Sequence, residues 1–168
     1  MPGGLLLPCC HRCTGLYVGA GVAALWHVTL KVRPTVRFLQ IHGLFLLMMV
    51  PFGFHWLPQG ELLRAWTGVL FGFGLVAFLW LTPSARTSES EDSKLRLSTA
   101  RFYWLGLALT LLAVPALGIS GGRSSAHTLS GLAALGALVL AALALANAGL
   151  AVASFARWFR RRKARLCA

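Results

Sequence analysis

Apolar residues dominate five stretches of this chain, and polar or basic residues separate them. A helix needs roughly 20 residues, at about 1.5 Å per residue, to cross a hydrocarbon core about 30 Å thick, and each stretch comes close to that length. The pattern therefore predicts an all-α fold, a polytopic transmembrane helical bundle that forms a single integral membrane domain over residues 1–168. We expect its spans at residues 14–30, 38–55, 66–81, 102–119 and 129–155.

The segments outside these spans differ in length and charge. Residues 82–101 form the longest connection, hold three of the four acidic residues, and are predicted to be a flexible, hydrated loop. The fifth span is long enough to tilt or to continue as an amphipathic end before a basic tail at residues 157–168. The first span lacks a basic region ahead of it and a small-residue cleavage site, so we expect it to remain as a helix.

Composition and charge support a membrane location. The chain is 57% hydrophobic with a mean hydropathy of +0.71, which is too apolar for an ordinary soluble domain. Alternate connections carry 13 of the 16 lysines and arginines, and the other set carries three. This bias predicts a multi-pass protein of the bacterial inner membrane, with its N-terminus outside and its C-terminus in the cytoplasm.

The formal charge of +12 does not indicate nucleic-acid binding here, because the basic residues lie between apolar runs and in the tail. Four consecutive cations in the tail are predicted to act as lipid or topology anchors. They are Arg160, Arg161, Arg162 and Lys163.

Three cysteines precede the first span, and the orientation above places them at the outer surface. Cys10 and Cys13 have C-x-x-C spacing at a helix N-terminus, which favours a thiolate. One interpretation is a structural disulfide or inert thiols. A second is a metal site, which needs further ligands such as Cys9 and His55 or His127. A third is a dithiol that exchanges electrons with a quinone, with Cys9 as a resolving partner.

A glycine pattern occurs twice, in the first and third spans. Gly15 and Gly19 follow a threonine in the first copy, and Gly68 and Gly72 follow one in the second. Glycines four residues apart let a second helix backbone approach closely. We expect the two spans to pack on each other or on symmetrical neighbours, and the recurrence is either a chance match or an internal duplication.

Polar residues also fall inside the spans, including His27, His42, Gln40 and Asn147. Such groups are costly in hydrocarbon, which raises the expectation of a function. His42 is a candidate axial ligand of a tetrapyrrole, although a histidine near a helix end is more often interfacial or hydrogen-bonded to a neighbour. Hydrolase chemistry is disfavoured, because Glu61 is the only carboxylate outside the acidic loop and no nucleophile-elbow serine is present.

The run from Cys10 to Gly19, CHRCTGLYVG, resembles a family of small prokaryotic predicted membrane proteins of unknown function whose hallmark is C-x-R-C-x-G-x-Y-x-G. A second stretch, Arg64 followed by TGVLFG at residues 67–72, looks like the same family's downstream element. The resemblance covers about residues 5–80. It implies a membrane-embedded helical fold with a cysteine cluster at the outer face, and it implies no reaction.

These observations lead to one main hypothesis and two alternatives. The main one is a non-catalytic accessory subunit that packs against lipid and other transmembrane proteins through faces of small residues. The first alternative is an outward-facing thiol redox or metal-binding protein. The second is a subunit of a respiratory or photosynthetic complex in contact with tetrapyrrole, quinone or carotenoid.

Overall fold

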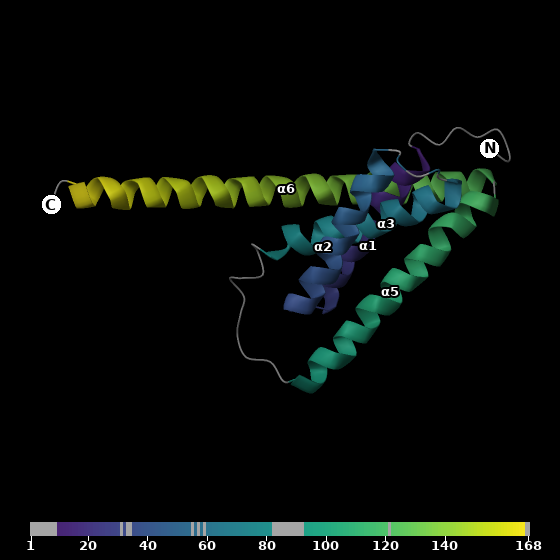
Figure 1. Ribbon diagram of the computed structural model, residues 1–168, viewed down its shortest axis with the longest axis horizontal. Coiled ribbons are helices and arrows are strands. Elements are labelled where there is room, and N and C mark those ends of the chain that lie inside the picture. Colours follow the sequence, from purple (N-terminus) through teal and green to yellow (C-terminus); the bar gives the residue numbers. More distant parts are fainter. Residues whose placement is uncertain are drawn as a thin grey trace.

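The computed structural model describes residues 10–30, 32, 35–54, 56, 58, 60–81, 93–120 and 122–166, with the backbone alone at 93–99, 119–120, 123 and 161–166. Within these residues the protein is all-helical, with no strand (Figure 1). The helices are α1 (His11–Leu30), α2 (Val36–Gly53), α3 (Glu61–Leu79), α5 (Ser93–Ser120) and α6 (Arg123–Leu166).

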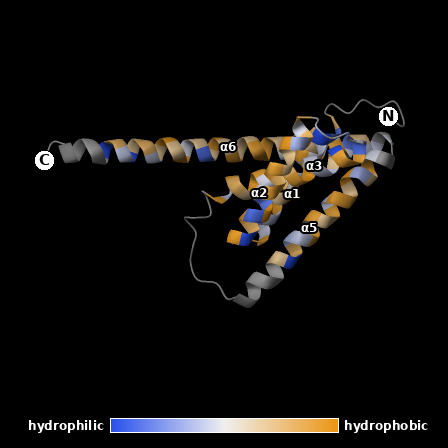
Figure 2. Ribbon diagram, in the orientation of Figure 1, coloured by the Kyte–Doolittle hydropathy of each residue, from blue (hydrophilic) through white to orange (hydrophobic). Residues whose placement is uncertain are grey.

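All five helices are long and apolar enough to cross a membrane, which confirms the predicted fold class and number of spans. Hydrophobic residues make up most of the described part of each helix in Figure 2. The helix ends are set by local chemistry. Thr35 caps α2 by accepting a hydrogen bond from the Phe38 amide at 3.2 Å, and Gly60 precedes Glu61 at the start of α3, where a negative charge complements the helix dipole.

Two helices extend furthest beyond the apolar spans that the sequence predicts. α5 begins at Ser93, so residues 93–101 are helical although they were expected to belong to the loop. α6 extends from Arg123 to Leu166 and includes most of the segment expected as a basic tail. Polar and basic residues are compatible with helix, so hydropathy alone marks only the apolar middle of each element.

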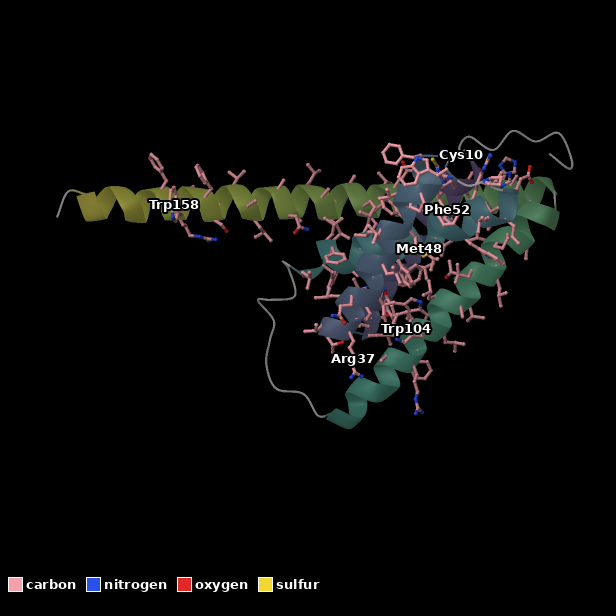
Figure 3. The ribbon with its side chains drawn as sticks, in the orientation of Figure 1. Cys10, Arg37, Met48, Phe52, Trp104 and Trp158 are labelled. Atoms are coloured by element: carbon pink, nitrogen blue, oxygen red, sulfur yellow. The ribbon has the colours of Figure 1, made fainter. Side chains whose placement is uncertain are left out.

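The helices alternate in direction, so both ends of the bundle collect residues from several elements. α1 and α3 begin, and α2 ends, at the end of the bundle that carries Cys10, which we call the thiol end. Arg37 and Trp104 lie toward the opposite end in Figure 3. This opposite end contains the start of α2 and the first part of α5 (Figure 1).

The core is centred on α3 and the helices that surround it. The residues with no exposed surface include Val69, Phe73 and Val76 of α3, Ala20 and Ala23 of α1, and Tyr103 of α5. α1 packs closely on α3 and α6, whereas α2 packs on α3. The small side chains of α1 allow this close approach, and the aromatic side chains of α3 and α5 fill the space beside it.

α6 extends well beyond the bundle (Figure 1). The Asn147 side-chain amide donates a 2.8 Å hydrogen bond to the carbonyl of Leu79, the last residue of α3, and so fixes the register of the two helices. Roughly 20 more residues of α6 follow Asn147, which corresponds to about 30 Å of helix past the end of α3. This segment differs from the rest of the bundle because it has no neighbouring helix in Figure 1.

Candidate dithiol site

Cys10 is the N-cap residue of α1. Its carbonyl accepts the first helical hydrogen bond, from the Thr14 amide at 2.9 Å, and its Sγ accepts from the Cys13 amide at 3.4 Å. The Cys10 thiol also donates to the Cys13 thiol, with 3.1 Å between the two sulfur atoms. The C-x-x-C spacing therefore brings the two thiols into contact, with Cys10 exposed and Cys13 half-buried.

The pKa of Cys10 reflects this position. Partial burial by itself raises the pKa of the Cys10 thiol. The hydrogen bonds with the Cys13 thiol and amide, the Arg12 amide, and the positive charge of Arg12 act in the opposite direction and outweigh it, so the net pKa lies below the usual value for a thiol. A lowered pKa at a helix N-terminus favours the nucleophilic thiolate.

The residues between the two cysteines connect the thiol end to the neighbouring helices. Arg12 Nη2 donates a 3.0 Å hydrogen bond to the carbonyl of Phe52 in the last turn of α2, where carbonyls lack helical partners. His11 Nε2 lies 3.9 Å from a Glu61 carboxylate oxygen in the first turn of α3. This interhelical contact of Arg12 depends on tertiary structure, so the sequence did not indicate it.

The predicted metal site has less geometric support than the dithiol. Among the described residues no group of three or more His, Cys, Asp and Glu side chains is arranged to hold a metal ion. Cys9 and His55, which were named as further ligands, lie outside the described residues, and His127 is exposed on α6. Metal binding at the cysteines therefore remains a prediction.

Glycines hold the start of α1 directly against α3. A Cβ on Gly15 would overlap the Ala65 carbonyl oxygen, and a Cβ on Gly68 would overlap the Arg12 carbonyl oxygen. The contact is reciprocal: Gly15 faces the residue three positions before Gly68, and Gly68 faces the residue three positions before Gly15. Because backbone atoms cannot rotate aside as a side chain can, no larger residue fits at either position.

The same relation repeats one turn further along both helices. A Cβ on Gly19 would lie 2.7 Å from the Val69 carbonyl oxygen, and a Cβ on Gly72 would overlap the carbonyl oxygen of Leu16. The α1–α3 contact therefore has an approximate two-fold symmetry between parallel helices. The four predicted packing glycines all lie at this contact within one chain.

His42 lies in the other half of the bundle and makes two hydrogen bonds. Its Nδ1 donates to the Phe38 carbonyl at 2.8 Å, which leaves Nε2 to accept from the Tyr103 hydroxyl at 2.8 Å. His42 and Tyr103 are both fully buried. Ligation of a tetrapyrrole through Nε2 would require this bond to break, so the geometry favours His42 as an interhelical hydrogen-bonding residue.

Aromatic rings surround this pair. His27 bonds to the Ala23 carbonyl at 2.8 Å and packs edge-on against Tyr103, with ring centroids 5.4 Å apart. Phe38 stacks on His42 at 4.0 Å. These contacts join α1, α2 and α5 in one cluster, which the sequence could not assemble because its members are far apart in the chain.

One side-chain hydrogen bond satisfies a carbonyl that a proline leaves without its helical donor. Pro115 in α5 has no amide hydrogen, so the Leu111 carbonyl four residues earlier loses its helical donor. Trp66 Nε1 of α3 donates to this carbonyl at 2.8 Å. In hydrocarbon an unsatisfied carbonyl is costly, so this bond compensates for the proline inside a span.

The predicted anchors occupy the far end of α6. Arg160 is exposed on the helix. The side chains of Arg161, Arg162 and Lys163 lie outside the described residues, although their backbone is helical. Their role as anchors remains a prediction.

The chain matches one known protein family over its first three helices. Residues 1–78 match the family model described as "Predicted membrane protein (DUF2085)". This match confirms the resemblance to a family of predicted membrane proteins of unknown function. No curated protein and no solved structure matches the chain.

The DUF2085 match contains the whole dithiol site. Cys10, Cys13, Arg12 and the four packing glycines fall within residues 1–78, as do α1, α2 and nearly all of α3. α5 and α6 follow the matched region. The matched part therefore includes both the thiols and the helix pair that positions them.

Proposed function

We propose that Cys10 and Cys13 form a thiol–disulfide couple at the surface of the membrane. The observation that carries this proposal is the 3.1 Å separation of the two sulfur atoms, with Cys10 exposed. A disulfide requires about 2.05 Å between the sulfurs, so oxidation needs a small local shift at the first turn of α1. The lowered pKa of Cys10 makes it the attacking thiol.

The oxidant in this proposal is a disulfide of another molecule. The Cys10 thiolate attacks one sulfur of that disulfide, forms a mixed disulfide and releases a thiolate. The Cys13 thiolate then attacks Cys10 Sγ, which forms the Cys10–Cys13 bond and releases the second thiolate. Two electrons pass to the partner, and the two protons of the cysteines are transferred to solvent or to the released thiolates.

The proposed setting is the outer face of a bacterial inner membrane. The distribution of lysine and arginine supports this orientation, because the connections at the end opposite the thiols carry most of the cations. The exposed Arg37 and Arg101 belong to that opposite end. An oxidising compartment outside the membrane would allow the disulfide to persist.

A redox titration tests the couple. The chain, with Cys9 and Cys167 changed to serine, is equilibrated in dithiol–disulfide buffers, and the remaining thiols are labelled with a maleimide. We expect Cys10 and Cys13 to lose labelling together along a two-electron curve, and Cys13 to stay labelled at every potential when Cys10→Ser is added. Independent labelling of the two thiols across all buffers would refute the couple.

Orientation is tested separately in intact cells. In the Cys9→Ser background, a membrane-impermeant maleimide should label Cys10 after mild reduction and leave Cys167 unlabelled until the cells are opened. Labelling of Cys167 alone in intact cells would reverse the orientation without affecting the redox couple. The two experiments therefore fail independently.

A second candidate function is that of an accessory subunit in a larger membrane complex. The small-residue faces of α1 and α3 pack on each other, so they are not available to a partner. The first half of α6 is available, because Leu135 and Leu138 are 62% and 68% exposed and a Cβ on Gly131 would meet no atom within 4 Å. This face would suit another transmembrane helix.

Substitution on this face tests the second candidate. Gly131→Ile adds a bulky side chain at a position where a partner helix would approach. Leu62→Ile, at an exposed residue on α3, serves as the control. Protein extracted from native membranes in mild detergent should migrate as a stoichiometric complex, and Gly131→Ile should reduce its yield. Migration of the unmodified chain as a monomer would contradict an accessory role.

A further inference from the structure

The last part of α6 is the feature that neither the bundle nor the dithiol explains. We call Gly149–Leu166 the distal arm. The apolar window of α6 spans Ser124–Arg160, or 37 residues. At about 1.5 Å per residue this is about 55 Å, far more than the roughly 30 Å of a hydrocarbon core. The distal arm therefore starts where an upright crossing of the membrane would already be complete.

The distal arm has an aromatic face. Phe155 stacks with Trp158 at a centroid distance of 5.8 Å and with Phe159 at 6.5 Å. All three rings are more than half exposed, as is Val152 one turn earlier. Figure 3 shows Trp158 on the part of α6 that lies away from the other helices. These rings would be unfavourable in water, so they require a partly apolar environment.

Two polar side chains, Ser154 and Arg157, lie to the side of the rings or opposite them. At about 100° per residue, Arg157 lies nearly opposite Phe155 and Phe159 around the helix axis. Arg157 bonds to the Ser154 hydroxyl at 3.2 Å, and Ser154 bonds to the Leu150 carbonyl, so these polar side chains lie together along the helix. Aromatic rings next to basic residues at the end of an apolar helix are typical of the level of the lipid head groups.

Charge decides which occupant fits this surface. Residues 149–168 contain six arginines and lysines and no acidic residue. A second copy of the arm would bring like charges together, whereas an anionic lipid surface attracts every one of them. The aromatic rings also fit lipid better than nucleic acid, because the arm continues directly from a membrane-spanning helix.

We propose that the distal arm is a binding site for anionic phospholipid head groups. In this arrangement the distal arm emerges from the hydrocarbon core at the membrane surface. Phe155, Trp158 and Phe159 lie at the level of the head groups, and Arg157 and Arg160 contact the phosphates. The proposal does not depend on the dithiol couple or on the orientation of the chain.

Quenching of Trp158 fluorescence tests the proposal. The full chain is placed in nanodiscs of phosphatidylcholine with or without phosphatidylglycerol, and the signal of Trp158 is obtained by subtracting that of Trp158→Phe. With phosphatidylglycerol we expect brominated lipid to quench Trp158 strongly and aqueous acrylamide to quench it about tenfold less than it does without phosphatidylglycerol. Equal acrylamide quenching in both lipids would overturn the proposal.

Charge variants separate lipid binding from other causes of protection. Arg160→Gln, Arg161→Gln and Arg162→Gln together should restore acrylamide quenching of Trp158 in the presence of phosphatidylglycerol. The matched control, Arg33→Gln, Arg86→Gln and Arg96→Gln, removes the same charge outside the arm and should leave protection intact. Protection from both quenchers that appears only in nanodiscs holding two chains would overturn the proposal in favour of pairing between copies.

Discussion

The α1–α3 pair and α6 use the same kinds of residue in different ways. About half of the apolar window of α3 and 44% of that of α1 are buried, compared with 17% for α6. A Cβ at Gly68 would overlap backbone, whereas one at Gly131 would meet nothing within 4 Å. A glycine-rich apolar helix is therefore a packing element only where another backbone lies opposite it.

This difference follows the position of the family match along the chain. The DUF2085 region ends within α3, so it contains the closely packed pair and the thiols that the pair supports. α6 contributes the long exposed surface, although Gly136 still contacts α1 at the Tyr17 carbonyl. The protein thus combines a closely packed unit around α1 and α3 with a helix whose far half is available to the membrane.

The largest expected effect is at the glycine contact. Gly68→Ala places a methyl group on the Arg12 carbonyl, which cannot move without shifting α1, and we expect a loss of about 3 kcal/mol in the free energy of unfolding. The matched change in α6, Gly131→Ala, should be neutral or stabilise by up to about 1 kcal/mol, because alanine is the better helix former. Unfolding by SDS in mild detergent measures both. Equal effects at the two positions would remove the distinction between the helices.

The next effect is at the buried hydroxyl. Tyr103→Phe keeps the ring but removes the donor to His42 Nε2, which leaves a buried acceptor unsatisfied and should cost about 2 kcal/mol. Tyr17→Phe provides the control, because Tyr17 is only partly buried and its hydroxyl should contribute less than about 0.5 kcal/mol. The same SDS unfolding measurement compares them. A cost for Tyr103→Phe no larger than that of Tyr17→Phe would show that this bond does not stabilise the cluster.

A smaller effect is expected where Trp66 compensates for Pro115. Trp66→Phe should cost about 1 kcal/mol, because the Leu111 carbonyl loses its donor. Pro115→Ala restores a helical amide to that carbonyl, so Trp66→Phe should cost less in this background. A double-mutant cycle of unfolding free energies measures the coupling. Additive effects would indicate that the indole N–H contributes nothing to α5.

Much of the architecture could be predicted from the sequence. Hydropathy gave five spans because each has an apolar middle about as long as a bilayer is thick. The same signal missed the start of α5 at Ser93 and the end of α6 at Leu166, because polar residues continue a helix without contributing to hydropathy. Local patterns thus predict the number of helices better than the residues at which the helices begin and end.

The candidate site divides in the same way. Cys10 and Cys13 could be identified from their spacing, because a C-x-x-C pair at a helix start lies within one turn. The contacts of Arg12 with Phe52 and of His42 with Tyr103 could not, because they join residues 40 and 61 positions apart. Such pairs depend on how helices pack, and the sequence indicated only one such contact, the one between the glycines of α1 and α3.

The smallest expected effect concerns the thiol pair itself. Because the fold lowers the pKa of Cys10, its reaction with a maleimide should reach half of its maximum rate at a lower pH than that of an unstructured cysteine. Since the shifted group is an acid with a depressed pKa, its contribution to stability is present above the usual thiol pKa and is lost as the pH falls through the folded value.

Two variants test the cause of this shift. Cys13→Ala removes the hydrogen bonds of the Cys13 thiol and should move the midpoint of the labelling rate to a higher pH. Ser125→Ala, at an exposed hydrogen bond near the start of α6, should leave the midpoint unchanged. Stopped-flow labelling in a Cys9→Ser, Cys167→Ser background gives the midpoint directly. An identical midpoint with and without Cys13 would mean that the helix start alone activates Cys10, and the second thiol would then serve only as the resolving partner.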